Sequence, residues 1–320
     1  MTEWTFLLSP AALALLLAFA LDRAFGEPPA RWHPVVRMGA YLGWAGRRIA
    51  PRSALSGRKA SSFLAGALAW SVGAASVALT AWVVQAALRH LPVVAATLLL
   101  GALLKPLLAW RMLRDEVLAV EAALGESLDA GRVRLGQLVS REVAQLSESD
   151  VREAAIESLA ENFCDSVVAP VFWFIVAGLP GAALYRFANT ADAMWGYRGM
   201  RQGADWTWAG KWAARADDVL SWIPARIAAL LLVVAARGLP LARLRRDAGR
   251  TLSPNSGWPM AAMALALDVR LGKPGVYALN GNARAPSSAH TARAVNLNAH
   301  ALAVMLPIAC LTLVILKRPW

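Results

Sequence analysis

The sequence predicts an all-α, polytopic integral membrane protein with a cytoplasmic helical region and broken or re-entrant helices. Of its 320 residues, 58% are hydrophobic and only 17% are charged, whereas soluble domains carry about 25% charged residues. Several apolar runs approach the roughly 20 residues that cross a bilayer as a helix. This composition excludes a disordered chain and argues against a single soluble globule.

The first region, residues 1–110, is expected to contain membrane segments at 5–21, 61–88 and 91–110. No basic residue precedes the first run and no clear small-x-small cleavage site follows it, so we expect a retained segment and not a signal peptide. The second and third runs are expected to form a transmembrane hairpin that turns at Arg89-His90, with Lys105-Pro106 interrupting the third.

The loops predict the orientation. Loop 22–60 carries eight Lys/Arg and two acids, which is typical of a cytoplasmic loop. Residues 111–165 then return to the cytoplasmic side. We therefore expect a multi-pass protein of the cell (inner) membrane whose active site faces the cytoplasm.

The third region, residues 166–320, has apolar runs at 167–187, 219–236 and 299–316 and two basic loops, 187–218 and 237–298. Both loops lie inside if 167–187 is broken at Pro170 and at Gly178–Gly181, so that two half-helices enter and leave on one side. Simple crossings with one basic loop outside are the alternative. The number of crossings stays open between four and six.

The net charge of +12 is unevenly distributed. Residues 111–165 hold twelve acids and six arginines, a net charge of −6, and the remaining residues carry +18. The 111–165 segment has helical periodicity without a spanning run and predicts an acidic cytoplasmic helical region, broken near Gly125 and Gly131. Aromatic residues lie in or beside apolar runs and not among basic patches, which disfavours nucleic acid as a partner.

The last helix of that region carries an acidic stripe. Asp150 followed by Glu153 resembles a capping signal, and the stripe recurs every fourth residue at Glu153, Glu157, Glu161 and Asp165. No Lys or Arg lies three or four residues from the last three of these acids. A solvated acidic face is one reading. Because the stripe runs into an apolar segment, we predict a Mg²⁺ site on Glu157, Glu161 and Asp165.

Further polar residues interrupt the apolar C-terminal region. Asn189 and Asp192 share a helix face, and Asp217 and Asp218 stand at the mouth of the 219–236 run. Buried Asn or Asp pairs can simply tie helices together, but ionisable residues at a membrane boundary are by default functional hypotheses. Together with the acidic stripe they predict a polar cavity.

Two loops supply further candidates. The Ser253–Gly257 loop opens a predicted helix over 260–272, with Pro259 near its start and Gly272 at its end; such a loop suits phosphate, or is an ordinary capped turn. In the N-terminal loop, Asp22 and His33 either act in catalysis or position the loop.

Other chemistries are not indicated. The sequence has no Walker A, Rossmann glycine, HExxH or nucleophile-elbow pattern. Cys164 and Cys310 are far apart, and we predict neither a disulfide framework nor a cysteine metal site.

Five blocks of the sequence together resemble the cobalamin-biosynthesis CobD/CbiB family, whose members are adenosylcobinamide-phosphate synthases. They occur in family order over nearly the whole chain: LDRAFGEPPARWHPV (21–35), ESLAENFCDSVVAP (157–170), NTADAMWGY (189–197), ARADDVLSWIPAR (214–226) and SPNSGWPMAAMALAL (253–267). Glu27, Ser166 and Ser221 depart from the family pattern, which casts doubt on an essential role for position 221.

The resemblance implies an amide-forming C–N ligase that joins adenosylcobyric acid to (R)-1-amino-2-propanol or its O-phosphate, with ATP and Mg²⁺. An acyl phosphate formed from ATP is the hypothesised intermediate. Mg²⁺ would lie on the three stripe carboxylates, with Asp192 or Asp217 completing its shell, and Asp218 would accept the amine proton. The residues expected to bind substrate or phosphate are Asp22, His33, Asn162, Asn189, Arg215, Arg226, Ser253, Asn255, Ser256 and Gly257.

Two rival functions stay open. A transporter for a corrinoid or a metal ion would also have broken helices, but it would place its acids at mid-bilayer in paired repeats. A membrane phosphotransferase would carry a closely spaced Asp motif on one helix, which is absent. The phosphorylation state of the amine and the oligomeric state are not predicted, although a homo-oligomer is compatible with the sequence.

Overall fold

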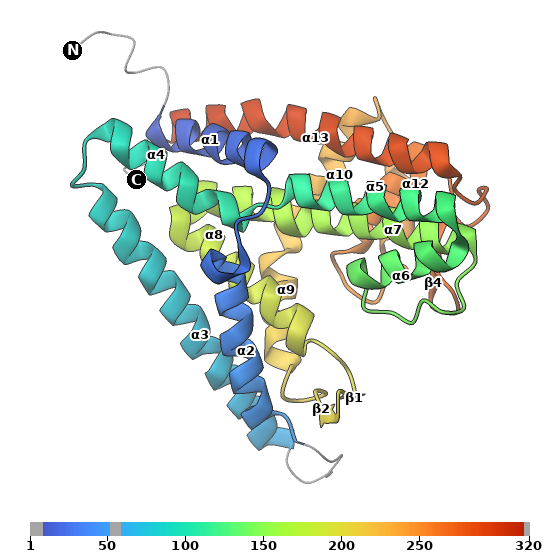
Figure 1. Ribbon diagram of the computed structural model, residues 1–320, viewed down its shortest axis with the longest axis horizontal. Coiled ribbons are helices and arrows are strands. Elements are labelled where there is room, and N and C mark those ends of the chain that lie inside the picture. The colour runs from blue at the N-terminus through green and yellow to red at the C-terminus, as the bar shows by residue number, and fades with distance from the viewer. Residues whose placement is uncertain (1–8, 52–58, 317–320) are drawn as a thin grey trace. The chain divides into compact units, whose positions relative to one another are not determined.

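The computed structural model describes residues 9–51 and 59–316, and the regular secondary structure of these residues is almost entirely helical (Figure 1). Within these ranges, four helices are long and apolar enough to cross a membrane: Lys59–Leu88, Val93–Glu126, Glu148–Trp195 and Ser288–Ile315. A fifth span results if Lys211–Leu220 and Trp222–Ala235, bent by 48° at their junction, count as one. The predicted all-α polytopic architecture is confirmed.

The chain divides into two compact units. The first unit comprises Met1–Ala109, Ala169–Ser221 and Ala309–Trp320, and the second comprises Trp110–Val168 and Trp222–Ile308. The chain first passes from one unit to the other between Ala109 and Trp110, next to the region boundary that was predicted after residue 110. Residues of the predicted third region, 166–320, contribute to both units.

The first unit contains α1 (Pro10–Phe25), α2 (Pro34–Ile49), α3 (Lys59–Leu88), α4 (Val93–Leu104), α8 (Ala169–Trp195) and α9 (Lys211–Leu220). Short 3₁₀ turns, η2 (Ala30–Trp32) and η3 (Lys105–Leu107), and the hairpin β1 (Met200–Arg201)–β2 (Ala204–Asp205) complete it. Glycines allow close helix packing: a Cβ on Gly101 of α4 would lie 2.9 Å from the Ala14 carbonyl oxygen of α1.

Helix α8 is broken at the predicted glycine. Ala177 and Gly178 leave the helical conformation, with φ of +67° at Gly178, and the chain changes direction there (Figure 1). The Leu179 N–H, freed by the break, donates to Oε1 of the buried Gln85 on α3 at 2.7 Å. Pro170, in contrast, stands at the start of α8 and does not break it. A one-sided entry and exit of the two segments stays a prediction.

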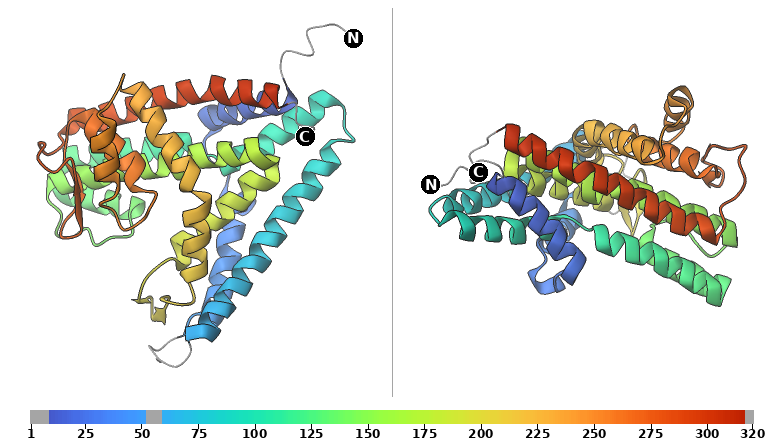
Figure 2. Two further views of the ribbon diagram at one scale, coloured as in Figure 1. Left: turned by 180° about the vertical axis from the view of Figure 1, so that it is seen from behind. Right: turned by 90° about the horizontal axis from the view of Figure 1, so that it is seen from above.

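The second unit contains α5 (Trp110–Glu126), α6 (Leu128–Leu138), α7 (Glu148–Phe163), α10 (Trp222–Ala235), α11 (Leu241–Ala248), α12 (Gly257–Leu267) and most of α13 (Ser288–Ile315). Helix α7 is its centre, with Ile156, Leu159 and Phe163 fully buried. Helices α5, α6 and α12 and the hairpin β3 (Leu271–Lys273)–β4 (Tyr277–Leu279) pack on α7. Helix α10 lies along α12, as the view from behind shows (Figure 2).

Three local predictions are corrected. The N-cap of α7 is Ser147, not Asp150: the Ser147 side chain accepts from the Asp150 N–H, and the Asp150 carboxylate accepts from the Ser147 N–H. Gly131 lies inside α6, and the break falls at Ser127, the N-cap of that helix. The helix predicted over 260–272 ends at Leu267, because Asp268 turns left-handed at φ +53° and Gly272 belongs to β3.

Candidate functional site

The acidic stripe lies on α7 and the π-helical turn η4 (Cys164–Val168) that extends it. Glu153 and Glu157 are only 3% and 1% exposed, and Glu161 and Asp165 are half-buried. The reading of a solvated acidic face is therefore wrong for the first two acids. The wider turn at η4 changes the direction of Asp165 relative to a regular helix; such π turns are frequent at functional sites.

Both buried carboxylates have arginine partners from distant segments. Arg270 donates to Oε1 of Glu153 at 2.8 Å, and Arg141 donates to Oε2 of Glu157 at 2.7 Å. The premise that the last three acids of the stripe lack a basic partner is therefore wrong for Glu157. The partners come from the loop between α6 and α7 and from the start of β3, 16 and 117 residues away in the chain, which spacing along one helix does not reveal.

The β3–β4 hairpin contributes Tyr277 and Lys273 to the surroundings of Glu157. The pKa of Tyr277 is raised, first by burial of the phenol and then by the negative charge of Glu157. The positive charge of Lys273 also acts on Glu157. We call Glu157, Arg141, Tyr277 and Lys273 the α7 cluster. A hydrogen bond between Tyr277 and the Glu157 carboxylate adds to the one from Arg141, so this buried carboxylate has two protein partners.

The predicted magnesium ligands are not preassembled. Among residues 9–51 and 59–316, no three His, Cys, Asp or Glu side chains are gathered as a metal site requires. Glu157 is already compensated by Arg141, and the described arrangement does not fit a resident metal ion held by protein groups alone. A site on Glu157, Glu161 and Asp165 stays a prediction that requires Glu157 to part from Arg141. Asn162, on the same helix, donates back to the Ser158 carbonyl oxygen.

Arg226 holds the loop that was predicted to bind phosphate. Its guanidinium donates to Oδ1 of Asn255 at 2.7 Å and to the Pro254 carbonyl oxygen at 3.2 Å. It also lies over the rings of Trp222 and Trp258. The Ser253 hydroxyl accepts from the N–H groups of Asn255 and Ser256, so part of the predicted phosphate cradle is engaged within the turn.

The acids of two other predicted blocks lie on helices α8 and α9, which pack against each other in the first unit. Asn189 and Asp192 lie one turn apart on α8, and Asn189 accepts a long 3.5 Å bond from Arg186. On α9, the Asp217 carboxylate accepts a hydrogen bond from the Ser221 hydroxyl. The positive charges of Arg215 and Arg198 act on the Asp218 carboxylate. Ser221 also contacts the Tyr185 hydroxyl at 3.1 Å, a packing contact within the first unit.

The N-terminal block forms a second charged cluster, which we call the Lys105 cluster. Nζ of the buried Lys105 lies 3.0 Å from Oε2 of Glu27 and 3.5 Å from Oδ1 of Asp22. His33 caps α2 by accepting from the Val35 N–H, and its other ring nitrogen lies 2.9 Å from Glu27. Burial would raise the pKa of Glu27, but the hydrogen bonds and charges of His33 and Lys105 lower it below its ordinary value.

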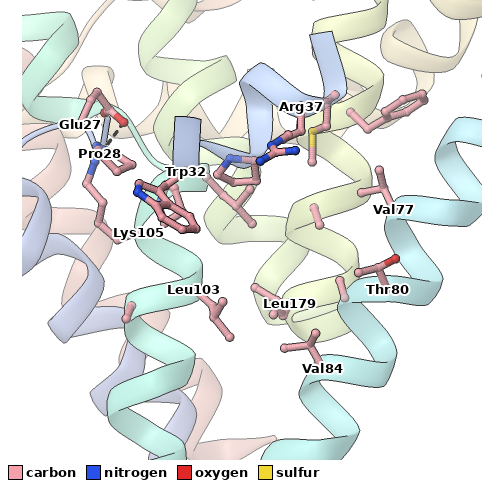
Figure 3. A pocket seen from close by; sticks show the side chains of 18 of the residues that line it. Glu27, Pro28, Trp32, Arg37, Val77, Thr80, Val84, Leu103, Lys105 and Leu179 are labelled. Atoms are coloured by element: carbon pink, nitrogen blue, oxygen red, sulfur yellow. Dashed lines mark ion pairs between the residues drawn. The ribbon is translucent and has the colours of Figure 1, made fainter. Parts of the chain in front are cut away.

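A cavity of about 960 Å³ adjoins the Lys105 cluster within the first unit. Its walls are mostly apolar side chains of α2, α3, α4 and α8. Figure 3 shows Glu27 and Lys105 together at one end, Trp32 beside them, and Leu103, Leu179 and Val84 at the opposite end. The cavity is therefore walled mostly by apolar side chains, with Glu27 and Lys105 at one end and Arg37 also in its lining.

Sequence reasoning missed several of these residues. Lys105 and Glu27 had usable signals, because a lysine inside an apolar run is an unusual intramembrane charge and Glu27 lies in a quoted block. Arg141, Arg270 and Tyr277 had none, since they meet α7 only through the tertiary fold.

The fold and its buried charged clusters define a polytopic α-helical membrane protein that encloses charged side chains among its helices. The pattern of the family described as CobD/Cbib protein matches residues 15–305. The chain therefore belongs to the CobD/CbiB family, as the resemblance indicated.

Individual relatives agree. The chain is 43% identical to a probable cobalamin biosynthesis protein CobD of Methanothermobacter thermautotrophicus over 83% of this chain and 85% of the relative. It is 42% identical to the cobalamin biosynthesis protein CobD of Chromobacterium violaceum, over 82% and 81%. For the protein of that name from Rhodobacter capsulatus the identity is 38%, over 92% and 95%. No solved structure matches the chain significantly.

Proposed function

We propose that the chain is the adenosylcobinamide-phosphate synthase of cobalamin biosynthesis, an amide-forming ligase of adenosylcobyric acid and (R)-1-amino-2-propanol or its O-phosphate. Family membership supports the role in cobalamin biosynthesis. The ligation chemistry, ATP as co-substrate and the cytoplasmic position of the site are proposals.

The α7 cluster is the observation that carries this proposal. It combines Glu157, a buried carboxylate of the ESLAENFCD block, with the cationic side chains of Arg141 and Lys273. Amide synthesis from a carboxylate needs positive charge where phosphate charge develops and an acceptor that takes a proton from the amine. The Glu157 carboxylate, buried beside Arg141 and Tyr277, is proposed for the second role.

The proposed reaction proceeds in two balanced steps. A corrinoid carboxylate oxygen attacks the γ-phosphorus of ATP, which forms an acyl phosphate and releases ADP. The amine nitrogen then attacks the acyl carbon, the carbon–oxygen bond to phosphate breaks, and the amine proton passes to a carboxylate. Glu157 is the acceptor favoured by its burial, and Asp218, the acceptor predicted from the sequence, is the alternative. Mg²⁺ enters only as the counter-ion of ATP.

Other predicted residues have supporting roles in this proposal. Arg226 orders the Ser253–Gly257 loop through Asn255, and this loop at the start of α12 is proposed to meet a nucleotide phosphate. Arg215 lies near Asp218 and is proposed to offset phosphate charge. His33 and Asp22 are proposed to position the N-terminal loop.

The transporter alternative receives less support. The broken helix α8 suits a transporter, but its freed N–H is satisfied by Gln85 and needs no transported ligand. The relatives are named as biosynthesis proteins, which favours an enzyme.

The test is amide formation by purified protein. Wild-type protein with adenosylcobyric acid, ATP, Mg²⁺ and either amine should form the amide, detected by its mass, and should release ADP. Glu157→Gln should lower turnover by about 10²-fold or more while the protein keeps its far-ultraviolet circular dichroism. Glu126→Gln, an exposed acid at the end of α5, is the matched control and should be fully active. Unchanged turnover in Glu157→Gln would contradict the proposed catalytic role of the α7 cluster.

A further inference from the structure

We infer that the 960 Å³ cavity of the first unit holds the corrin ring of the substrate, with the amide-bearing edge of the ring against the Lys105 cluster. This inference rests on the proposed function. It is argued from the size of the cavity, the charged residues in its lining and the exposed tryptophan beside it.

The size and polarity of the cavity select among the proposed substrates. Ligand pockets range over about 300–1,000 Å³, so this one suits a large ligand. Val77, Val84, Leu103 and Leu179 give it long apolar walls (Figure 3). Aminopropanol phosphate is too small and polar for such walls, and the triphosphate of ATP is too highly charged. A corrinoid has broad apolar ring faces and a polar edge.

The Lys105 cluster indicates which polar groups of the ligand can lie at this end of the cavity. Two carboxylates, Asp22 and Glu27, share one lysine, and His33 donates towards Glu27 because its other nitrogen accepts the Val35 N–H. Arg37 adds a second cation to the cavity lining. Oε1 of Glu27 is buried and accepts no hydrogen bond from the described residues, and leaving such an acceptor unsatisfied is destabilising. A carboxamide N–H of a ligand would satisfy this acceptor.

Trp32 adds a flat surface. Its side chain is 71% exposed although it lines the cavity, and Figure 3 shows it close to Lys105 and Glu27. The Arg31 guanidinium lies over the ring at 5.8 Å, and the exposed remainder of the ring can pack against a planar ligand.

The test compares two valine substitutions on one helix. Val84→Trp fills the cavity from α3, and Val83→Trp, its neighbour, places the same ring on the exposed side of the helix outside the lining. Equilibrium dialysis with adenosylcobyric acid, followed by its visible absorbance, measures binding. Val84→Trp should raise the Kd at least about tenfold, which corresponds to about 1.4 kcal/mol, and Val83→Trp should leave it within about twofold.

Trp32→Ala, on an exposed turn, covers the case in which Val84→Trp fails to fold. It should raise the corrinoid KM several-fold, by about 1 kcal/mol or less of lost stacking, with kcat and the KM for ATP unchanged. Wild-type levels of binding in both Val84→Trp and Trp32→Ala, in protein that still forms the amide, would overturn the cavity assignment and leave the proposed function intact. A lipid that co-purifies in the cavity and is not displaced by corrinoid would also overturn it. Absence of both binding and amide formation in wild-type protein would instead count against the proposed function itself.

Discussion

Arg141 donates a 2.7 Å hydrogen bond to Glu157, and the two side chains are 16% and 2% exposed. An arginine from the loop before α7 thus compensates a carboxylate that the helix buries. A buried carboxylate without such a partner would be too costly to keep ionised. The pair compensates the charge of Glu157 at a buried position, where the proposed proton transfer from the amine needs an ionised acceptor.

Arg141→Met should strongly destabilise the second unit. Removing one partner of a buried ion pair leaves an uncompensated charge and typically costs about 3–5 kcal/mol. We expect a clear fall in the thermal inactivation temperature in detergent, largely reversed in the double variant Arg141→Met/Glu157→Gln, because the second substitution removes the stranded charge.

The matched control is Arg134→Met, which breaks a pair of similar length with Glu116 at 2.7 Å, where both side chains are about one-third exposed. Exposed pairs contribute about 0–1 kcal/mol. Equal losses of stability in the two arginine variants would contradict the assigned burial of the Arg141–Glu157 pair.

The break in α8 depends on Gln85 and Gly178. Gln85→Leu removes the acceptor of the Leu179 N–H and should cost about 1–3 kcal/mol. Gly178→Ala should destabilise as well, because φ is +67° and an added Cβ would meet the Gln85 side chain at 2.5 Å. Gly125→Ala, a helical glycine of α5 with open space around it, should be neutral or slightly stabilising. Thermal denaturation ranks the three; a Gly178→Ala protein as stable as Gly125→Ala would exclude the described break.

The Lys105 cluster predicts a pH dependence. The folded pKa of Glu27 lies below its ordinary value of 4.5, so ionised Glu27 stabilises the fold above that pH, and the contribution is lost as the pH falls through the folded pKa. Wild-type protein should therefore be more stable than Glu27→Gln at pH 7, and the difference should shrink below about pH 4.5. Exposed Glu126→Gln should show no such trend. A difference that grows towards acid pH would reverse the sign and reject the ion pair.

Arg226 offers a test of the Ser253–Gly257 loop. Arg226→Lys keeps the charge but loses the planar fork that binds Asn255 and Pro254 and covers two tryptophan rings. We expect a KM for ATP raised several-fold with the corrinoid KM unchanged, and no change from Arg245→Lys on the exposed face of α11. Equal KM values for ATP in wild type and Arg226→Lys would leave the loop without a role in nucleotide binding.

The sequence predicted those features that depend on local pattern. Apolar length located the long helices, Gly178 located the break in α8, and Lys105-Pro106 the turn after α4, because each depends on a few adjacent residues. The helix ends that were predicted wrongly depend on the tertiary structure. Helix α12 ends before Asp268, where the chain turns towards β3, and the N-cap of α7 is Ser147 and not Asp150.

For the candidate site, spacing placed Glu153 and Glu157 on one face of α7 but not their partners. Arg270 is 117 residues away from Glu153, and only the hairpin β3–β4 brings it and Tyr277 to that helix. The cavity escaped sequence reasoning for the same reason, since its walls come from four helices that no single periodicity relates.

The central claim, ligation through an acyl phosphate, is tested most directly by the fate of carboxylate oxygen. Purified protein is given adenosylcobyric acid labelled with ¹⁸O in its free carboxylate, together with ATP, Mg²⁺ and aminopropanol phosphate. One labelled oxygen should appear in inorganic phosphate for each amide formed, because the carbon–oxygen bond to phosphate breaks when the amine attacks. Label in AMP would contradict the acyl phosphate, and absence of the amide would contradict the assignment as a ligase.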